Sequence, residues 1–290
     1  MVRWRGVIDV VMSGLNILKG NNVDFLLDAD KELGKEFKSQ GYIVRSVENL
    51  KQLTLFRDLV KSLAQDSVTG LVEDPAKALN EFHKHISAAD LNPARLKIIH
   101  GMNEQEWTRP AFFELARTWL ERLVGNELAM QLRLNLSIQM PGDSSSLLPI
   151  HSDAWGGDSP FEVVVWLHLV DCYRTKSMFL LPPEPTTRLH QQFGDLAGKS
   201  SEDIYQAVKD DLIWMSIPYG SFLLFNQNLP HGNRVNEEDE TRWSVNCRFK
   251  GVFTPYSQKK LGEFFEPITL RPASDLGLKY EYPVIRSDEG

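Results

Sequence analysis

Three residues of the kinds that bind metal ions form an ordered pattern in the second half of the chain. His151 and Asp153 are separated by one residue, and His231 follows much later. Two imidazoles and one carboxylate can hold a ferrous ion from one side and leave positions open on the other. The pattern therefore predicts a metal site whose open positions can bind reactants.

An arginine and a serine further along the chain could anchor an anion beside that metal. Arg242 and Ser244 lie two positions apart in a segment that we predict to be a strand, so their side chains point to the same side. A planar guanidinium can pair with a carboxylate through two parallel hydrogen bonds, and a hydroxyl can add another. These two residues predict a site for the distal carboxylate of a dicarboxylate cosubstrate.

Each part of the pattern has an ordinary explanation when it is taken alone. With 7 His and 39 Asp and Glu in 290 residues, about one H-x-D or H-x-E pair is expected by chance. By themselves, His151 and Asp153 could be a surface histidine and a turn aspartate, and His231 a structural loop histidine. The order and the strand context of the whole set favour the metal site.

The elements that must position these residues differ between the two parts of the chain. Residues 1–127 are predicted to be mainly helical, because apolar residues recur at three-and-four spacing in 47–64 and again in 110–128. A short strand at 41–44 is expected to lead into the first of these helices. This part is predicted to pack on the remainder of a single domain that spans 1–290.

From about residue 130 the hydrophobic period changes to two, which is typical of strands. Residues 131–139 alternate without a break and are predicted to form one strand, and a helix with a capping box is expected at 200–208. The other predicted strands are 161–170, 178–181, 211–217, 221–225 and 241–253. Short strands joined by Gly and Pro turns indicate a jelly roll over 128–255. Residues 256–290 are expected to be a C-terminal tail, loop-like after about 265.

The last predicted strand has one polar and one apolar face. The polar face carries Arg242, Ser244, Asn246 and Arg248, and the other face carries Trp243, Val245, Cys247 and Phe249. Two interpretations remain open: the polar face is the solvated side of an edge strand, or it lines the interior of an active-site barrel. The polar residues of 131–139 leave the same choice.

The composition excludes several classes of protein. A net charge of −7 and a pI of about 5.6 argue against recognition of a nucleic acid through bulk charge. Two separated cysteines, Cys172 and Cys247, argue for a reducing compartment, and no apolar run is long enough to cross a membrane. Residues 1–18 faintly resemble a signal peptide, but Asp9 interrupts the apolar run, so a cytoplasmic protein is expected, either a monomer or a homodimer.

The motifs resemble those of the 2-oxoglutarate/Fe(II)-dependent dioxygenases, in particular the phytanoyl-CoA hydroxylase-like branch. That pattern is H-x-D, a distal His after a Gly-hydrophobic strand, and an Arg about eleven residues beyond that His. Residues 154–157 and 249–253 also resemble members from bacterial carbohydrate and aminoglycoside biosynthetic clusters. The resemblance covers about 40–255, although its specific motifs span only 151–248.

The resemblance implies a double-stranded β-helix with helices packed outside it. It further implies that His151, Asp153 and His231 hold Fe(II), that Arg242 and Ser244 bind 2-oxoglutarate, and that molecular oxygen is consumed. Asn135 is assigned to the cosubstrate site beside them. Hydroxylation is the expected reaction, with desaturation or ring closure using the same residues.

The expected substrate is a small polar molecule, most simply a sugar or an aminocyclitol. Four residues are assigned to bind it, because their groups suit hydroxyls or give a ring an apolar platform: Trp155, Arg133, Gln139 and Arg248. Two alternatives remain open. One is a cupin-like metal enzyme that needs no 2-oxoglutarate and hence no Arg242, and the other is a catalytically silent carbohydrate-binding jelly roll that depends on Trp155 and Trp166.

Overall fold

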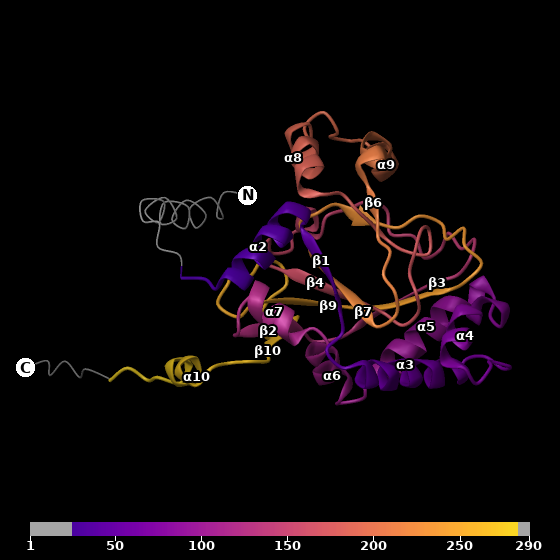
Figure 1. Cartoon of the computed structure of the whole chain (residues 1–290), viewed down its shortest axis with the longest axis horizontal. Coiled ribbons are helices and arrows are strands. Elements are labelled where there is room, and N and C mark those ends of the chain that lie inside the picture. Colours follow the sequence, from indigo (N-terminus) through magenta and orange to yellow (C-terminus); the bar gives the residue numbers. More distant parts are fainter. Residues whose placement is uncertain (1–24, 284–290) are drawn as a thin grey trace, which may run out of the picture.

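The computed structural model describes residues 25–283 and consists of two antiparallel sheets flanked by helices (Figure 1). Within these residues the larger sheet has seven strands in the order β1-β7-β4-β9-β2-β10, with β3 also paired to β9. Their bounds are β1 Tyr42–Ser46, β2 Leu128–Gln131, β3 Asn135–Gln139, β4 Val163–His168, β7 Ser221–Asn226, β9 Arg242–Gly251 and β10 Phe265–Pro267. The smaller sheet has the order β6-β5-β8, with β5 Phe179–Leu180, β6 Ile213–Trp214 and β8 His231–Gly232.

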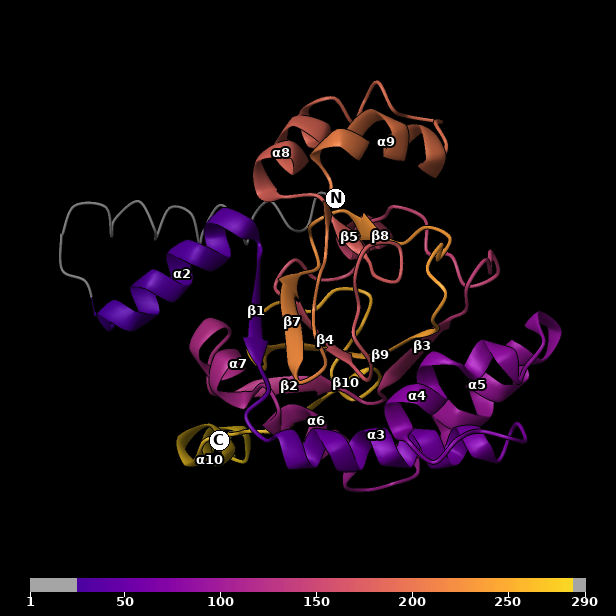
Figure 2. The same ribbon diagram turned by 45° about the vertical axis from the view of Figure 1, so that its right-hand side comes forward.

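Most of the helices come from the first part of the chain and pack against the larger sheet; in Figure 2, α3 to α6 lie below it, and α2 and α7 lie to its left. They are α2 Asp28–Gln40, α3 Leu50–Gln65, α4 Pro75–Asn80, η1 Phe82–Lys84, α5 Ala88–Asn103, α6 Thr108–Glu114 and α7 Arg117–Leu123. Two later helices, α8 Pro183–Gln191 and α9 Ser201–Val208, lie above the smaller sheet with η3 Lys209–Asp211. The remaining helical segments are η2 Asp153–Gly156 and α10 Pro272–Leu278.

Strand β9 separates the apolar core from the interior of the jelly roll. Trp243, Val245, Cys247 and Phe249 are fully buried in the core that the helices form with the larger sheet. The alternate residues of β9 point between the two sheets, because side chains alternate across a strand. The predicted division of this strand into two faces is confirmed, and its polar face lies inside the protein.

A second apolar cluster packs between the two sheets beyond the polar interior. Val164 and Trp166 of β4 and Phe225 of β7 meet Met178 and Leu180 from the smaller-sheet side. This packing fixes the spacing between the two sheets, because close-packed side chains resist local displacement. Together with the antiparallel pairing it confirms the predicted jelly roll.

Two predicted elements are each divided into two. The expected strand 131–139 breaks between β2 and β3, because the side chain of Asn103 forms two hydrogen bonds with the backbone of Leu134, at 2.8 and 3.0 Å. The expected helix 110–128 breaks between α6 and α7, where the Leu115 carbonyl accepts a hydrogen bond from the Glu48 N–H at 3.2 Å. In both cases a residue from a distant part of the chain forms hydrogen bonds with backbone groups that a continuous strand or helix would have used for its own hydrogen bonds.

The tail after about 265 is more ordered than expected. Strand β10 pairs with β2, with Glu266 opposite Met130, and α10 follows it. The expectation of a loop-like tail is therefore wrong. The other predicted strands and the capping box at Ser200 and Asp203 are confirmed.

The remaining expectations concern the termini and the cysteines. Residues 1–18, with their faint resemblance to a signal peptide, lie outside the described part of the chain. Within the described part, no helix is both long and apolar enough to cross a membrane. Cys172 and Cys247 are buried free thiols, and burial raises the pKa of each to about 12.

Candidate metal and anion site

The two histidines of the predicted metal site are joined through their backbones. The N–H of His151 donates to the carbonyl of His231 at 3.0 Å, and the N–H of His231 donates to the carbonyl of His151 at 2.8 Å. His231 is also the first residue of β8 and pairs with Leu180 of β5. Asp153 begins η2 directly after this bridge. Candidate ligand atoms of His151, Asp153 and His231 all lie within 4.8 Å of one another.

Both imidazoles are held in the same way. Nδ1 of His151 lies 2.8 Å from the carbonyl of Pro149, and Nδ1 of His231 lies 2.8 Å from the carbonyl of Leu229. Because a carbonyl can only accept, each Nδ1 must carry the proton, which leaves the Nε2 lone pair free. Such a bond from the far ring nitrogen is the usual orienting contact of a metal-binding histidine.

The charges of the site suit a divalent cation. Burial, followed by the neighbouring His151, lowers the pKa of His231 to about 4, so this imidazole is neutral at pH 7. Burial would raise the pKa of Asp153, but the Arg248 guanidinium and the two histidines outweigh it and hold that pKa below its usual value. The site therefore presents the neutral imidazole of His231 beside the ionised carboxylate of Asp153, and both forms are the ones that bind a cation.

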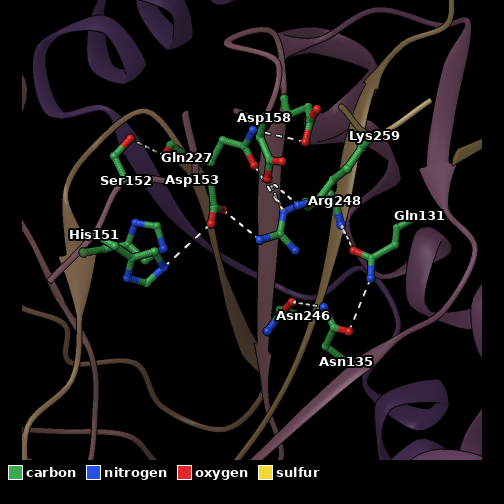
Figure 3. Close-up of polar contacts among 12 residues, drawn as sticks. Gln131, Asn135, His151, Ser152, Asp153, Asp158, Gln227, Asn246, Arg248 and Lys259 are labelled. Atoms are coloured by element: carbon green, nitrogen blue, oxygen red, sulfur yellow. Dashed lines mark hydrogen bonds and ion pairs between the residues drawn. The ribbon is translucent and has the colours of Figure 1, made fainter. Parts of the chain in front are cut away.

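Arg248 of β9 contacts this carboxylate from the side away from the histidines (Figure 3). Its Nη2 donates to Oδ2 of Asp153 at 2.8 Å, and its Nε donates to Oε1 of Gln227 at 3.2 Å. A second carboxylate, that of Asp158, lies 3.8 Å from Nε and is also paired with Lys259. Arg248 thus lies in a charged network directly behind the metal ligand.

These residues surround a cavity of about 110 Å³ between the two sheets. The triad lines one part of the cavity and Arg242 lines another. The lining residues are Ser137, Leu148, His151, Asp153, Val164, Trp166, Met178, Phe225, His231, Asn233, Arg242, Asn246 and Arg248. The histidines, Asp153 and Arg242 therefore share one cavity, as the sequence predicts.

Arg242 is a buried cation with hydrogen-bonding capacity to spare. Only 2% of the residue is exposed, and burial lowers its pKa to about 10. Nη1 donates to the carbonyl of Ser177 at 2.9 Å and Nη2 donates to Oγ of Ser137 at 3.0 Å, whereas Nε has no partner. Among residues 25–283, no carboxylate forms an ion pair with this guanidinium.

Other buried polar groups near Arg242 also lack partners. Within the described part of the chain, the hydroxyl oxygens of Ser177 and Ser244 form no hydrogen bond, and neither do the two ring nitrogens of His168. His168 pairs with Ser244 across β4 and β9, and burial, followed by the charge of Arg242, lowers its pKa to about 3. Unpartnered buried polar groups are rare in proteins, so their gathering here indicates a place for an anion or for water.

Several residues that the sequence assigned to the cosubstrate or substrate lie elsewhere. Arg133 is exposed at the bend between β2 and β3, so its predicted place on an interior strand face is wrong. The Trp155 indole donates to His190 at 3.2 Å, and its ring contacts that of Phe193 at 4.8 Å between centroids. Trp155 thus packs toward α8 and lies outside the cavity lining.

Gln139 and Asn135 lie inside the protein but behind the cavity. The amide of Gln139 donates to the Arg234 carbonyl at 2.6 Å, and Gln139 is fully buried. Asn135 donates to Asn246 at 3.0 Å and accepts from Gln131, as Figure 3 shows. Asn135 therefore contacts a residue of the cavity wall, whereas a direct contact of either residue with a ligand remains only a prediction.

Three residues of the site were not singled out from the sequence. Ser137 binds Arg242, Asn233 lines the cavity, and His168 lies beside Ser244. The sequence does contain one signal for His168. It is a polar residue in a strand of otherwise apolar residues, and it lies two positions after Trp166, so both side chains point to the same side of the strand. Ser137 and Asn233 belong to polar segments in which no single residue is distinctive.

Comparison with known proteins adds information about the fold. No protein-family model matches the chain, and no curated protein matches it. Among solved structures, it is similar to the non-heme monooxygenase ThoJ in a nickel complex, with 13% identity, 83% of this chain and 85% of that chain covered, and a TM-score of 0.52. It is also similar to apo HygX from Streptomyces hygroscopicus, with 14% identity, 78% and 88% covered, and a TM-score of 0.50. These likenesses confirm the double-stranded β-helix that the sequence resemblance implies.

Proposed function

We propose that this protein is a non-haem Fe(II)- and 2-oxoglutarate-dependent oxygenase that oxidises a small polar metabolite. The observation that carries the proposal is one cavity that contains both a His-Asp-His set and a buried, unpaired arginine. The His-Asp-His set can bind a metal, and the buried arginine can bind a carboxylate. Their combination suits a cosubstrate that chelates the metal at one end and carries a carboxylate at the other.

The donors present fit ferrous iron. Nε2 of His151 and His231 and a carboxylate oxygen of Asp153 are the ligand types that hold this ion while leaving positions open for reactants. Bound there, iron would supply the activation of oxygen that is coupled to decarboxylation of a 2-oxo acid. The protein's own contribution is to orient the ligands through the carbonyls of Pro149 and Leu229 and to limit access of water.

The surroundings of Arg242 fit the distal carboxylate of 2-oxoglutarate. A buried guanidinium without a counter-charge is costly, and an anionic ligand would remove that cost. Nε and the unpartnered hydroxyl of Ser244 are donors available to it. A metal enzyme that needs no such cosubstrate has no evident use for an unpaired arginine at this position.

The substrate proposal is a small polar molecule, with sugars and aminocyclitols as the first classes to test. Asn246 on the cavity wall supports it, because its amide oxygen accepts from Asn135 while its amide nitrogen can donate to a hydroxyl group. The cavity itself has room for little beyond a cosubstrate, so the substrate is expected to bind at the exposed end beside His151. The likeness to a non-heme monooxygenase supports a scaffold suited to such chemistry.

Anaerobic titration provides the primary test. Fe(II) and 2-oxoglutarate added together should produce a weak visible charge-transfer band that neither produces alone. Iron binding without this band would favour a cupin-like enzyme that uses no 2-oxoglutarate. Absence of iron binding would favour a catalytically silent binding module.

Once the band is observed, a library of sugars and aminocyclitols can be screened for compounds that stimulate succinate release. Stimulation by members of this library would identify the substrate class, and stimulation by lipids or amino acids alone would contradict the proposed class.

A further inference from the structure

The two oxygens of the Asp153 carboxylate have different neighbours. Oδ2 accepts a hydrogen bond from Nη2 of Arg248 at 2.8 Å, whereas Oδ1 lies 3.7 Å from Nε2 of His151. Among residues 25–283, no donor binds Oδ1, and this oxygen faces a candidate metal-binding nitrogen. Figure 3 shows the carboxylate between the histidine and the guanidinium. A carboxylate whose second oxygen already accepts a charge-assisted hydrogen bond is restricted in how it can bind a cation.

Arg248 is itself held firmly in place. Its Nε donates to Gln227, which is fully buried and donates in turn to the Glu162 carboxylate at 3.1 Å. Asp158 attracts the guanidinium from another side and is paired with Lys259. The side chains of Arg248, Asp153 and Asp158 are only 16%, 9% and 9% exposed, so solvent screens these contacts weakly. The guanidinium is therefore fixed before any ligand binds.

These contacts differ from those expected of a residue that binds substrate. The sequence assigned Arg248 to the substrate because its guanidinium suits hydroxyl groups and was expected to line the barrel interior. Arg242 has no carboxylate partner among residues 25–283, whereas Arg248 pairs with one carboxylate and lies near a second. The two arginines on one face of β9 therefore differ in electrostatic state, and only Arg242 retains an unsatisfied positive charge.

We propose that Arg248 is a positioning residue that makes Asp153 bind the metal through Oδ1 alone. The proposal rests on the proposed function, because it concerns the ligand set of that metal. Three single-atom donors from the protein leave positions for a chelating cosubstrate and for oxygen. A carboxylate that bound through both oxygens would take one of these positions. Arg248 prevents this by occupying Oδ2.

The test uses Co(II) in place of iron, because its visible spectrum reports the number and kind of ligands. Replacing Arg248 alone would leave two buried carboxylates with less positive charge, which can prevent folding. The main variant is therefore Asp158→Asn with Arg248→Met, which removes one charge of each sign. Its matched control is Asp158→Asn alone. Arg248→Lys keeps the charge and can still donate to Oδ2, so it serves as the conservative variant.

Without cosubstrate, the double variant should show a Co(II) spectrum altered from that of the control. Its affinity for 2-oxoglutarate in the Co(II) form should fall about tenfold or more, in the range typical for loss of a contact to a metal ligand. Arg248→Lys should recover most of the wild-type spectrum. Unchanged Co(II) spectra in the double variant would overturn the proposal, and weaker 2-oxoglutarate binding with an unchanged spectrum would mean that Arg248 contacts the cosubstrate directly. Failure of the wild-type protein to bind Co(II) would instead contradict the proposed function.

Discussion

His151 and His231 exchange a pair of backbone hydrogen bonds that bring their imidazole centroids to 4.4 Å from each other. The two candidate ligands are therefore placed by main-chain pairing, before any side-chain contact is considered. His231 is also paired with Leu180 of β5, so the smaller sheet holds this bridge in position. Changes that disturb the backbone here should affect metal binding even though they remove no ligand.

Gly232→Ala tests this dependence on the backbone. A Cβ at this position would lie 2.6 Å from the Leu148 carbonyl oxygen and 3.1 Å from the Pro149 carbonyl carbon, which is too close for either to remain in place. The change should displace the segment before His151, destabilise the protein by about 1–3 kcal/mol, and weaken Ni(II) binding. Urea unfolding and calorimetric titration with Ni(II) measure the two effects. Gly194→Ala, where a Cβ meets nothing within 4 Å, is the control and should leave both unchanged.

Removal of a candidate ligand should abolish metal retention. His231→Ala leaves the fold intact but deletes a neutral imidazole whose lone pair faces the cavity. Metal content after anaerobic loading with Fe(II) and desalting should fall from near one equivalent to background. His100→Ala, an exposed histidine on α5, should retain the wild-type content. Stoichiometric iron in His231→Ala would mean that the metal site lies elsewhere.

Arg242→Met should weaken 2-oxoglutarate binding while leaving the metal bound. Loss of a hydrogen bond to a charged group typically costs about 1.5–3 kcal/mol, which corresponds to a roughly ten- to hundredfold loss of affinity. Titration of the charge-transfer band with 2-oxoglutarate measures this loss of affinity. Arg133→Met makes the same change at an exposed position on the bend after β2 and should have no effect. Equal affinities in the two variants would exclude Arg242 as the anchor.

His168 should make the metal-free protein less stable in mild acid. Burial lowers its pKa to about 3 from an ordinary value of 6.5, so below pH 6.5 the unfolded chain takes up a proton that the folded protein does not. Stability therefore falls as the pH decreases through this range and recovers as it rises. Between pH 6.5 and 5, His168→Gln should lose about 2 kcal/mol less unfolding free energy than the wild type. Parallel urea titrations at the two pH values test this, and equal losses would contradict it.

The sequence was most informative where a pattern repeats within one element. The alternation through Arg242, Trp243, Ser244 and Val245 predicted both faces of β9, because a strand exposes successive residues to opposite sides. The gathering of His151, Asp153 and His231 could be predicted because the residue types are few and their order is restrictive, while their binding of a metal stays a prediction. The first inference depends on local geometry, which a short stretch of sequence specifies, and the second depends on the order of residues far apart in the chain.

The rest could not be predicted, because it depends on contacts between distant segments. Nothing within 131–139 indicates that Asn103 will bind the Leu134 backbone and turn Arg133 outward. Trp155 was expected to give a substrate ring an apolar platform because it lies beside the metal motif in the sequence, yet its partners are His190 of α8 and Phe193 just beyond that helix. The pairing of Arg248 with Asp153 likewise joins residues that no local pattern connects.

The cavity has one closed end and one open end, and this has a kinetic consequence. Arg242 is almost wholly buried, whereas the side chain of His151 is 38% exposed. An anion held by Arg242 would therefore pass the candidate metal ligands on its way in, and a molecule beside His151 would block its way out. Steady-state turnover should follow a compulsory order in which 2-oxoglutarate binds before the substrate. Excess substrate should accordingly trap the dicarboxylate product and slow its release.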